Sequence, residues 1–533
     1  MTKRALLINL TRFGDLLQTQ PAVSGLKAGG YDVGLATMEN FHAAAGLLRD
    51  VEWAAPLPGS RLLARTERSW PEGLAELHGF LGRVRDEFSP DLAVNLTPSL
   101  SARLLARNLP AAERRGFGLD EHGFNADTPS WAAFLQIASE ERGASPFNIC
   151  DLFRRVCGLT GPGADLSLRR PDRAAVDAAS ERLFAAVPSG TPFSGFAALQ
   201  LGASEERRRW PVEHFAELAS RLWTRERLVS VLVGGAGEKP LGDRLRTMVD
   251  CPVVDLMGAT DLEQLAATLT CCGLLATNDT GTMHLAAGLA VPVVAVFLAT
   301  AQPWDTGPYR AGSLCLEPDE PCHPCAFGTE CPHGEKCRRS VTVDAVWACA
   351  RRQLGRRGEA EDFSGARVWR SAWADAGLLG LQSLSGHGDT GRVRWIELQR
   401  DCYRHFLDGE DMDEYGGGPD GATGDGSLSS SPERTGTDAA TSAANGLAEA
   451  EALLFLLRQQ GALLGRDPRA ALKSKFLAGC QRIPLALRAH PSLRVLASLW
   501  IFESQNHARD FPGLLSLIDR FHGLCRALLR SIG

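Results

Sequence analysis

Short, continuous apolar runs recur along the first 355 residues and are separated by longer stretches with helical spacing. The runs lie at residues 4–10, 31–37, 91–96, 196–201, 228–234, 252–256, 273–277 and 292–297. Helical apolar spacing between them is clearest at 212–224 and 261–270. Unbroken apolar runs are typical of strands buried on both faces of a parallel sheet, and strands that alternate with helices form doubly wound domains. The sequence therefore predicts an α/β fold.

The predicted strands fall into two groups, within residues 4–125 and 196–300. Segments rich in Gly, Pro and Ser, at 158–171 and 187–194, read as the connector between them. We therefore predict two doubly wound halves with a cleft between them, one over 1–185 and one over 186–357.

The chain changes character after residue 357. Helical spacing at 366–380 and 392–407 predicts a helical extension over 358–407. Residues 408–445 are rich in Gly, Ser, Thr, Ala and acidic residues, which predicts a disordered acidic linker whose simplest role is a tether. Helical spacing returns at 448–460, 471–480, 492–503 and 512–529, so 446–533 is predicted to form a helical bundle for oligomer or partner contacts.

The charge balance limits the classes of partner. Lys and Arg number 57 and Asp and Glu 63, for a formal net charge of −6, which argues against a dedicated nucleic-acid-binding protein. The apolar run at 5–10 is too short for a signal peptide, and no window is long enough for a transmembrane helix. A reducing cytoplasm is the expected compartment for the 14 cysteines.

The segment 276–287, with the sequence ATNDTGTMHLAA, carries the strongest functional signal. It follows a predicted strand and opens an Ala-rich helix, so Asp279, Thr280 and Gly281 are expected at a helix N-terminus. Free backbone N–H groups and the positive end of the helix dipole make such a terminus an anion site, well suited to a diphosphate. Ordinary helix capping by Asp and Thr is the alternative.

Two further strand ends carry polar residues. After the run at 196–201, three arginines at 207–209 precede a Trp-Pro pair that opens a helix. An arginine side chain can donate two hydrogen bonds to one phosphate group. Three consecutive side chains cannot all face one ligand, however. The alternative interpretation is a run of charged residues exposed to solvent. After the first strand, a Gly turn presents Asp15, a candidate general base that could instead be a turn or cap residue.

Together and in this order, the three segments resemble glycosyltransferase family nine, the ADP-heptose:lipopolysaccharide heptosyltransferase family. The carrying motifs are FGD-x-L-x-x-x-P from Phe13, RRWP-x-x-x-FA-x-L from Arg208, and TNDTG-x-MHLAA, followed by the apolar run 292–297 and TGPY at 306–309. The resemblance spans residues 3–355. It implies a GT-B fold of two Rossmann-like domains, an acceptor-side domain over 1–185 and a nucleotide-sugar domain over 186–357, and metal-independent, inverting transfer of a heptose from a nucleotide diphosphate.

The resemblance also assigns roles to residues. Asp15 matches the catalytic base. Arg208 stands where relatives often carry Lys against the donor phosphates, with Arg209 beside it, and Glu238 matches a contact to the nucleotide ribose. The remaining donor-binding candidates are Asp279, Thr280, Gly281, Thr282 and His284, although a histidine on a helix face is more often structural.

The expected partners are an ADP-heptose donor and a glycolipid or protein acceptor, with no nucleic acid and no catalytic cofactor. The C-terminal part lies outside the family pattern, so the sugar and the acceptor stay open between a lipopolysaccharide core, another cell-envelope acceptor and a protein. A membrane-embedded acceptor would need peripheral docking at the inner membrane face. Leu62, Leu63 and Trp70, among arginines 61, 65 and 68, could form a basic amphipathic surface for it or simply cover the core. A non-catalytic nucleotide-sugar-binding scaffold is the competing class of function.

Four cysteines are concentrated in a Cys-rich loop predicted over 315–340. Cys322, Cys325, Cys331 and Cys337 follow a C-x2-C-x5-C-x5-C pattern. Four thiolates suit a structural Zn or Fe ion. Free thiols and a single disulfide between Cys322 and Cys325 are the alternatives, and the residues do not decide between the two metals.

Overall fold

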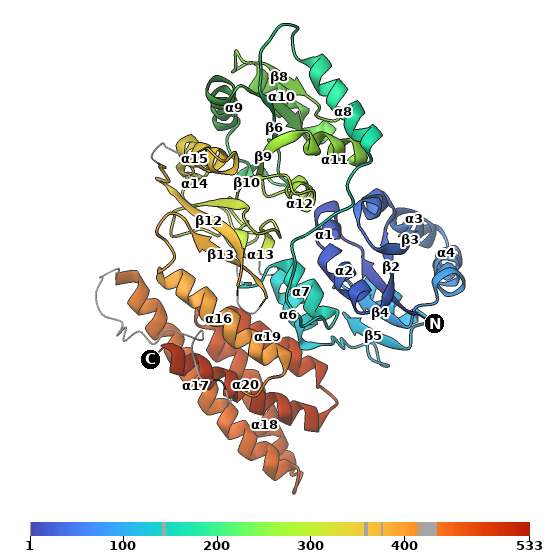
Figure 1. The fold of residues 1–533 in the computed structure, drawn as a ribbon. Coiled ribbons are helices and arrows are strands. Elements are labelled where there is room, and N and C mark those ends of the chain that lie inside the picture. The colour runs from blue at the N-terminus through green and yellow to red at the C-terminus, as the bar shows by residue number, and fades with distance from the viewer. Residues whose placement is uncertain are drawn as a thin grey trace. The chain divides into compact units, whose positions relative to one another are not determined.

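A computed structural model describes residues 2–140, 145–356, 361–374, 377–412, 415 and 434–532. The chain forms two compact units (Figure 1). The first comprises Met1–Arg115 and Phe147–His387, and the second comprises Gly116–Pro146 and Gly388–Gly533. The sequence had assigned residues 116–146 to the N-terminal domain, whereas the structure groups them with the C-terminal helices.

The first unit begins with a five-stranded sheet in the order β3-β2-β1-β4-β5. Its strands are β1 (Lys3–Asn9), β2 (Tyr31–Met38), β3 (Val51–Leu57), β4 (Leu92–Asn95) and β5 (Glu113–Gly116). Strand β1 pairs in parallel with β2 and with β4, so both of its edges are hydrogen-bonded. This position explains its unbroken apolar run, because Ala5–Asn9 is fully buried.

The helices of this half lie between its strands and beyond them. They are α1 (Phe13–Leu17), α2 (Gln20–Ala28), η1 (Glu39–Leu47), α3 (Gly59–Arg68), α4 (Trp70–Arg83), η2 (Val84–Phe88), α5 (Leu100–Asn108) and α7 (Ile149–Val156). Helix α1 directly follows the carboxyl end of β1, which is where ligands bind in doubly wound folds.

The second sheet has eight strands in the order β13-β12-β11-β10-β9-β6-β7-β8. Its strands are β6 (Gly195–Gln200), β7 (Leu228–Val233), β8 (Val253–Asp255), β9 (Cys272–Asn278), β10 (Val293–Val296), β11 (Leu314–Pro318), β12 (Ala366–Trp373) and β13 (Leu379–Ser383). The strands from β8 to β11 pair in parallel. Each of the eight apolar runs predicted as strands is a strand here or in the first sheet, and the predicted GT-B-type α/β fold class with a C-terminal helical region is confirmed.

The connections of the second sheet carry the remaining helices of the first unit. They are α8 (Arg173–Ala186), η3 (Glu206–Arg208), α9 (Val212–Glu226), η4 (Ala236–Glu238), α10 (Lys239–Arg246), α11 (Leu262–Thr270), α12 (Gly281–Gly288), α13 (Pro303–Thr306), α14 (Cys337–Ser340) and α15 (Val343–Gln353). The predicted helices at 212–224 and 261–270 correspond to α9 and α11. Apolar side chains of α9, α15 and the central strands form one core cluster.

The helix predicted at 366–380 is wrong, because this segment forms β12 and begins β13, which pair antiparallel with each other. Strand β12 also pairs antiparallel with β11. The sheet therefore continues past the doubly wound part, and the backbone groups of 366–373 are bonded on both sides. Of the described residues in the extension predicted at 358–407, those that are helical belong to α16 (Gly391–Asp408).

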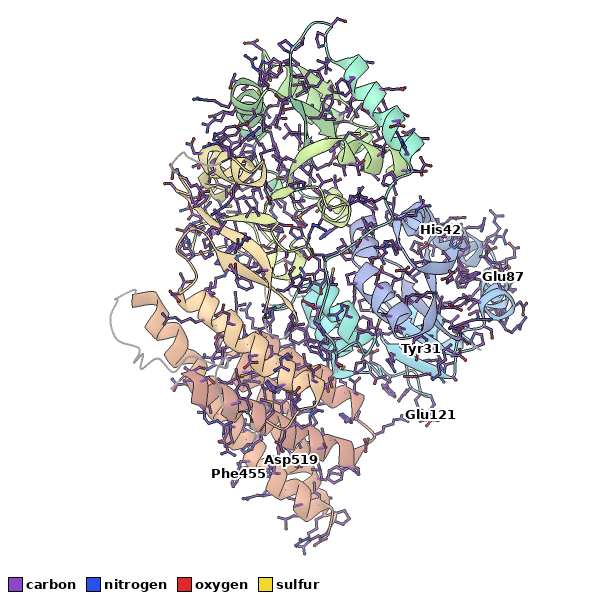
Figure 2. All side chains as sticks on the ribbon, in the orientation of Figure 1. Tyr31, His42, Glu87, Glu121, Phe455 and Asp519 are labelled. Carbon is purple, nitrogen blue, oxygen red and sulfur yellow. The ribbon has the colours of Figure 1, made fainter. Side chains whose placement is uncertain are left out.

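The second unit is helical. Its elements are α6 (Ser130–Glu140), α16, α17 (Arg434–Leu464), α18 (Ala470–Arg488), η5 (Pro491–Leu493), α19 (Arg494–Asn506) and α20 (Phe511–Ile532). Helix α6 is bonded to the C-terminal helices, since Ser130 donates to Glu503 (2.8 Å) and Trp131 Nε1 donates to Asp408 (2.9 Å). Figure 2 labels Asp519 of α20, which pairs with Arg458 of α17.

The four helices predicted after the linker are confirmed as α17, α18, α19 and α20. Helix α17 begins at Arg434, so the last part of the segment predicted as a linker is helical. Residues 413–414 and 416–433 of that segment lie outside the described residues. Among the helices that the structure describes, none combines the length and apolar character needed to cross a membrane.

Candidate functional site

The carboxyl ends of β6 and β9, neighbours in the sheet, are joined by one buried amide. Asn278, the last residue of β9, is fully buried. Its Nδ2 donates to the carbonyl oxygens of Leu201 (2.9 Å) and Gly202 (3.0 Å), and its Oδ1 accepts from the backbone N–H of Trp210 (2.8 Å). The Asn278 side chain thus fixes both ends of the segment after β6 against the end of β9. As a result, the arginine motif after β6 and the aspartate motif after β9 lie side by side.

Arg208 and Asp279 meet at this junction. The Arg208 guanidinium donates to the Asp279 carboxylate and, through Nη1, to Ser204 Oγ (3.0 Å). Only 10% of the Arg208 side chain and 8% of the Asp279 side chain are exposed. Two residues 71 positions apart, both predicted to bind the donor, therefore form one nearly buried ion pair. Its charges are compensated, which a nearly buried pair requires.

The other two arginines turn away from this pair. Arg209 donates through Nε and Nη2 to the carbonyl oxygen of Ala203 (both 3.2 Å). Arg207 donates to Glu205 (2.7 Å) and to the carbonyl oxygen of Thr329 (2.8 Å). The three arginine side chains thus have different partners within the protein, and a donor contact for any of them stays a prediction.

A second polar chain links the predicted ribose contact to α12. Glu238 accepts from Gln200 Nε2 (3.0 Å) and from the backbone N–H of Gly235 (2.9 Å). Thr282 Oγ1 in turn donates to Gln200 Oε1 (3.3 Å). A Cβ atom at Gly202 would overlap the Glu238 carboxylate, so the absence of a side chain at 202 makes room for that carboxylate.

The first turn of α12 has the form of an anion site. Thr280 is the N-cap residue, and within the described structure its hydroxyl makes no capping hydrogen bond but lies 3.2 Å from Thr277 Oγ1. Helix α12 is buried from Thr282 to Gly288, including His284. The N–H groups of the first turn and the helix dipole both favour an anion at this end.

Helix α1 packs against this turn from the N-terminal sheet. An ideal Cβ at Gly14 would lie 3.1 Å from Gly281 Cα, and one at Gly281 would lie 2.5 Å from Phe13 Cδ1. The two glycines thus let the segments approach closely, and Asp15 follows immediately on α1. Asn9, at the end of β1, donates to the carbonyl oxygen of Asp15 (3.3 Å). The structure therefore brings the predicted base to the helix end that carries Asp279, Thr280 and Gly281.

The four cysteines of the predicted metal cluster are free thiols and range from exposed (Cys322) to buried (Cys337). Burial, and then the proximity of the other three thiols, raises the pKa of Cys337 to about 11, and burial also raises the pKa of Cys325. Within the described residues, no group of three or more His, Cys, Asp or Glu side chains is arranged to hold a metal ion. The disulfide alternative is not found among these thiols.

The basic surface considered for membrane docking is partly paired. Arg61 (3.1 Å) and Arg65 (2.5 Å) both contact Glu76 of α4. Leu63 and Trp70 remain largely exposed. Membrane docking through this surface stays a prediction.

Sequence reasoning missed Gln200 and Asn278 as organisers of the site. Gln200 is the polar last residue of an otherwise apolar strand, and Asn278 has the same position in β9. A buried polar residue at the carboxyl end of a central strand was the available signal, because such a residue must find hydrogen-bond partners.

The matching family model and the curated relatives are heptosyltransferases. Residues 85–336 match the model of "Glycosyltransferase family 9 (heptosyltransferase)". Lipooligosaccharide heptosyltransferase 2 of Haemophilus influenzae is 34% identical over 98 residues, which are 18% of this chain and 28% of that protein. Lipopolysaccharide heptosyltransferase 2 of Salmonella typhimurium is 36% identical over 94 residues, which are 17% and 27% of the two chains. The chain thus matches little more than a quarter of the length of these relatives.

Among solved structures, E. coli ADP-heptose LPS heptosyltransferase II is similar at 18% identity with a TM-score of 0.48. That similarity covers 66% of this chain and 98% of the other chain.

Proposed function

We propose that this chain, which belongs to glycosyltransferase family 9 (heptosyltransferase), transfers a heptose or similar sugar from an ADP-activated donor to a hydroxyl group of a cell-envelope acceptor. One observation carries the proposal: the Gly14–Gly281 approach puts the carboxylate-bearing helix α1 against the helix end that adjoins the Arg208–Asp279 pair. A general base, an anion site and an oriented cation are the groups that displacement of a nucleotide diphosphate requires.

In this proposal the donor diphosphate binds at the N-terminus of α12. The N–H groups near Thr280, Gly281 and Thr282 donate to it, and Arg208 adds a positive charge. Because Asp279 and Ser204 already orient Arg208, little reorganisation is needed when negative charge grows on the leaving group. Preorganised donors of this kind contribute roughly 3–4 kcal/mol each to lowering the barrier. Glu238 is the proposed acceptor for ribose hydroxyls, and Arg209 and His284 are further donor-side candidates.

Asp15 is the proposed general base. It removes the proton from the acceptor hydroxyl as that oxygen attacks the anomeric carbon, and the nucleotide diphosphate leaves from the opposite face. The C–O bond to the acceptor forms as the bond to the diphosphate oxygen breaks, so the configuration at the anomeric carbon inverts. A positioned carboxylate base typically accelerates such a step about 100- to 10,000-fold.

The proposed acceptor is the lipopolysaccharide core, with contact at the membrane face. The family membership supports a lipopolysaccharide acceptor. A protein acceptor is the second candidate, and the observation that favours it is the helical unit formed by Gly116–Pro146 and Gly388–Gly533, which lies beyond the 85–336 family match over most of its length.

The test is binding and turnover of ADP-, GDP- and UDP-sugars by the purified full chain, its Asp15→Asn variant and a matched control, Asp32→Asn, which alters a carboxylate paired with Lys27 at the surface. We expect selective use of ADP-sugars, and we expect Asp15→Asn to keep binding while losing turnover about 100-fold or more. Asp32→Asn should behave as the unchanged protein. Equal turnover by Asp15→Asn would rule out the base and favour the scaffold function, and no affinity for any nucleotide sugar would overturn the proposal.

The four clustered cysteines are a separate proposal: a structural Zn or Fe site with no part in the transfer step. Their chemistry fits such an ion, because a nearby metal stabilises thiolates that burial, and then the proximity of the other thiols, otherwise disfavour. Their arrangement here is not that of a formed site, so binding would have to draw the thiols together. Metal quantification on the purified chain should give one ion per chain, lost in a Cys325→Ser, Cys337→Ser double variant. A metal-free chain with four alkylatable thiols would contradict the proposal.

A further inference from the structure

The short turn that carries Arg208 is bonded on its outer side to the Cys-rich loop, here the residues 319–340 that follow β11. Arg338 Nε donates to the carbonyl oxygen of Arg209 (3.1 Å). From the turn, Arg207 Nη1 donates to the carbonyl oxygen of Thr329 (2.8 Å). Just beyond the loop, Val341 accepts from Trp210 Nε1 (2.8 Å). Three hydrogen bonds thus connect the arginine segment 207–210 to 329–341.

The turn needs such support because it has little structure of its own. Element η3 is a single 3₁₀ turn of three residues, Glu206–Arg208, without a side-chain cap in the described structure. In one isolated turn, the loss of backbone conformational entropy is larger than the stabilisation from its hydrogen bonds. Its shape therefore depends on tertiary contacts, with Asn278 on the inner side and the Cys-rich loop on the outer side.

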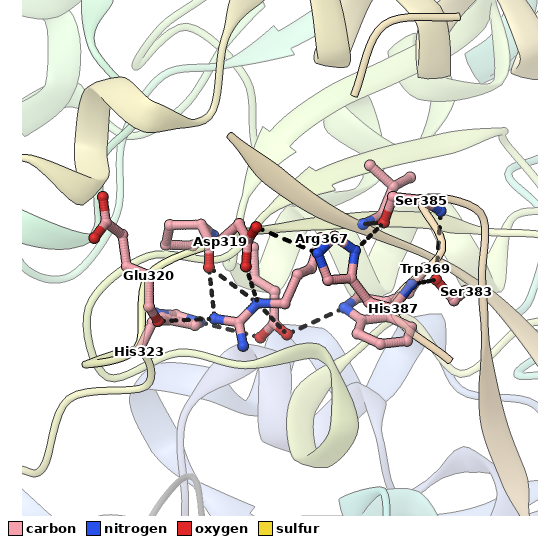
Figure 3. A network of polar contacts seen from close by, with 11 residues as sticks. Asp319, Glu320, His323, Arg367, Trp369, Ser383, Ser385 and His387 are labelled. Atoms are coloured by element: carbon pink, nitrogen blue, oxygen red, sulfur yellow. Dashed lines mark hydrogen bonds and ion pairs between the residues drawn. The ribbon is translucent and has the colours of Figure 1, made fainter. Parts of the chain in front are cut away.

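The loop can act as a support because its start is anchored in the sheet (Figure 3). Glu317 of β11 is fully buried and accepts from His323 of the loop (3.1 Å) and from Trp369 Nε1 of β12 (3.1 Å). Arg367 of β12 contacts the same carboxylate (3.5 Å) and donates to the loop carbonyl oxygen of Glu320 (3.1 Å). A buried carboxylate left without these partners would be costly, so the network holds the loop in place.

A second anchor lies at the thiols. The backbone N–H of Cys325 donates to the carbonyl oxygen of Ala299 (2.8 Å). Ala299 holds a left-handed conformation, φ 55°, which a non-glycine residue adopts at a cost and which this hydrogen bond helps to maintain.

We propose that the Cys-rich loop is a positioning element of the donor site: Arg338 and Arg207 hold the 206–209 turn so that Arg208 meets Asp279 in the orientation that binds a nucleoside diphosphate. The inference rests on the proposed function, in which Arg208 is a donor contact. In this inference the Glu317 network holds the loop, and the loop holds the turn that carries Arg208, so both affect donor binding without touching the substrate.

The test compares three variants of the full chain by ADP titration calorimetry, thermal unfolding and hydrogen exchange. Arg338→Ala removes the tie to Arg209. Arg338→Gln removes the charge but keeps an N–H donor at the same distance along the side chain as the arginine Nε. Arg339→Ala removes the same charge from the exposed neighbouring residue.

We expect Arg338→Ala to weaken ADP binding about tenfold and to speed amide exchange at 204–210, while Arg338→Gln and Arg339→Ala stay within about twofold of the unchanged chain. A general loss of stability would lower the melting temperature but leave the ADP affinity of the folded chain unchanged. Weaker ADP binding by Arg338→Ala, restored in Arg338→Gln, would therefore show that the hydrogen bond positions the turn. If Arg338→Ala does not fold, Arg207→Ala tests the second tie with the same expectation.

Unchanged exchange at 204–210 in Arg338→Ala would overturn the inference whether or not ADP binds. Equal weakening by alanine and glutamine would overturn it as well, because charge would then matter and not the hydrogen bond. If the unchanged chain binds no ADP, the proposed function fails, while the exchange result still decides whether the loop holds the turn.

Discussion

On the N-terminal sheet the candidate site depends on one five-residue helix, α1, whereas on the eight-stranded sheet it depends on several buried polar side chains. Helix α1 has no side-chain cap in the described structure, and its last two residues are its buried ones. On the eight-stranded sheet, the Asn278 side chain makes three hydrogen bonds and that of Gln200 makes two, and Arg208 donates both to Asp279 and to Ser204.

This difference matches what each side is proposed to do. A leaving diphosphate gains negative charge during the reaction and is stabilised best by groups that are oriented beforehand. A base needs one carboxylate within reach of the acceptor hydroxyl, and small movements of its helix can bring it there. The densely bonded side is therefore suited to the donor, and the sparsely bonded side to the acceptor.

The largest effect expected from this comparison is the loss of stability in Asp279→Ala. The substitution leaves the Arg208 guanidinium nearly buried without its carboxylate partner, and breaking a buried pair in this way costs about 3–5 kcal/mol in the free energy of unfolding. Denaturant unfolding measures the change.

The matched control is Asp32→Ala, which breaks a pair with Lys27 whose side chains are both 37% exposed. Exposed pairs contribute less than about 1 kcal/mol, so this variant should unfold almost as the unchanged chain does. Similar losses in both variants would mean that the Arg208–Asp279 pair is no more important to the fold than a surface contact.

Gly281→Ala addresses the contact between the two sides and should have a smaller effect. The added Cβ would lie 2.5 Å from Phe13 Cδ1, so α1 must shift away from α12. Overpacking of this kind costs about 1–3 kcal/mol. We expect sugar transfer to fall more than ADP binding, because the base moves while the arginine pair does not.

The control is Gly237→Ala, since a Cβ at 237 meets no atom within 4 Å. Kinetics with an ADP-sugar and calorimetry with ADP separate the two effects. If Gly281→Ala weakens ADP binding as much as it slows transfer, the two sides of the site do not act separately.

The parts of this fold that the sequence predicts are those that depend on burial alone. A strand such as β1, between two neighbours and covered on both faces, is a continuous apolar run whatever its partners are. The convergence of Arg208 and Asp279 was predictable for the same reason, because the carboxyl ends of parallel strands share one edge of a sheet. Their direct contact also depends on the pairing of β6 with β9, which the sequence did not predict.

The sequence could not predict what depends on pairing partners. Strand β12 reads ARVWRSAW and is a strand because β11 and β13 lie on either side of it. Strand β5 has the charged sequence ERRG and is likewise recognised only by its place in the sheet. The bonds by which Arg338 and Asn278 hold the arginine segment go to backbone groups, which carry no sequence signature. Residues 116–146 join distant helices through side-chain contacts that no local pattern indicates.

The smallest expected effect is a difference in local opening between the two sides, read by hydrogen exchange. Helix α1 has five residues and few buried side chains, whereas α12 is buried from Thr282 to Gly288, so amides of 12–17 should exchange about tenfold faster than those of 282–288. Added ADP should slow exchange at 203–210 and 279–283 and leave 12–17 within about twofold, because ligand binding protects what it contacts. If ADP slowed exchange at 12–17 as much as at 203–210 and 279–283, α1 would belong to the donor side. The two halves would then not have separate donor and acceptor functions.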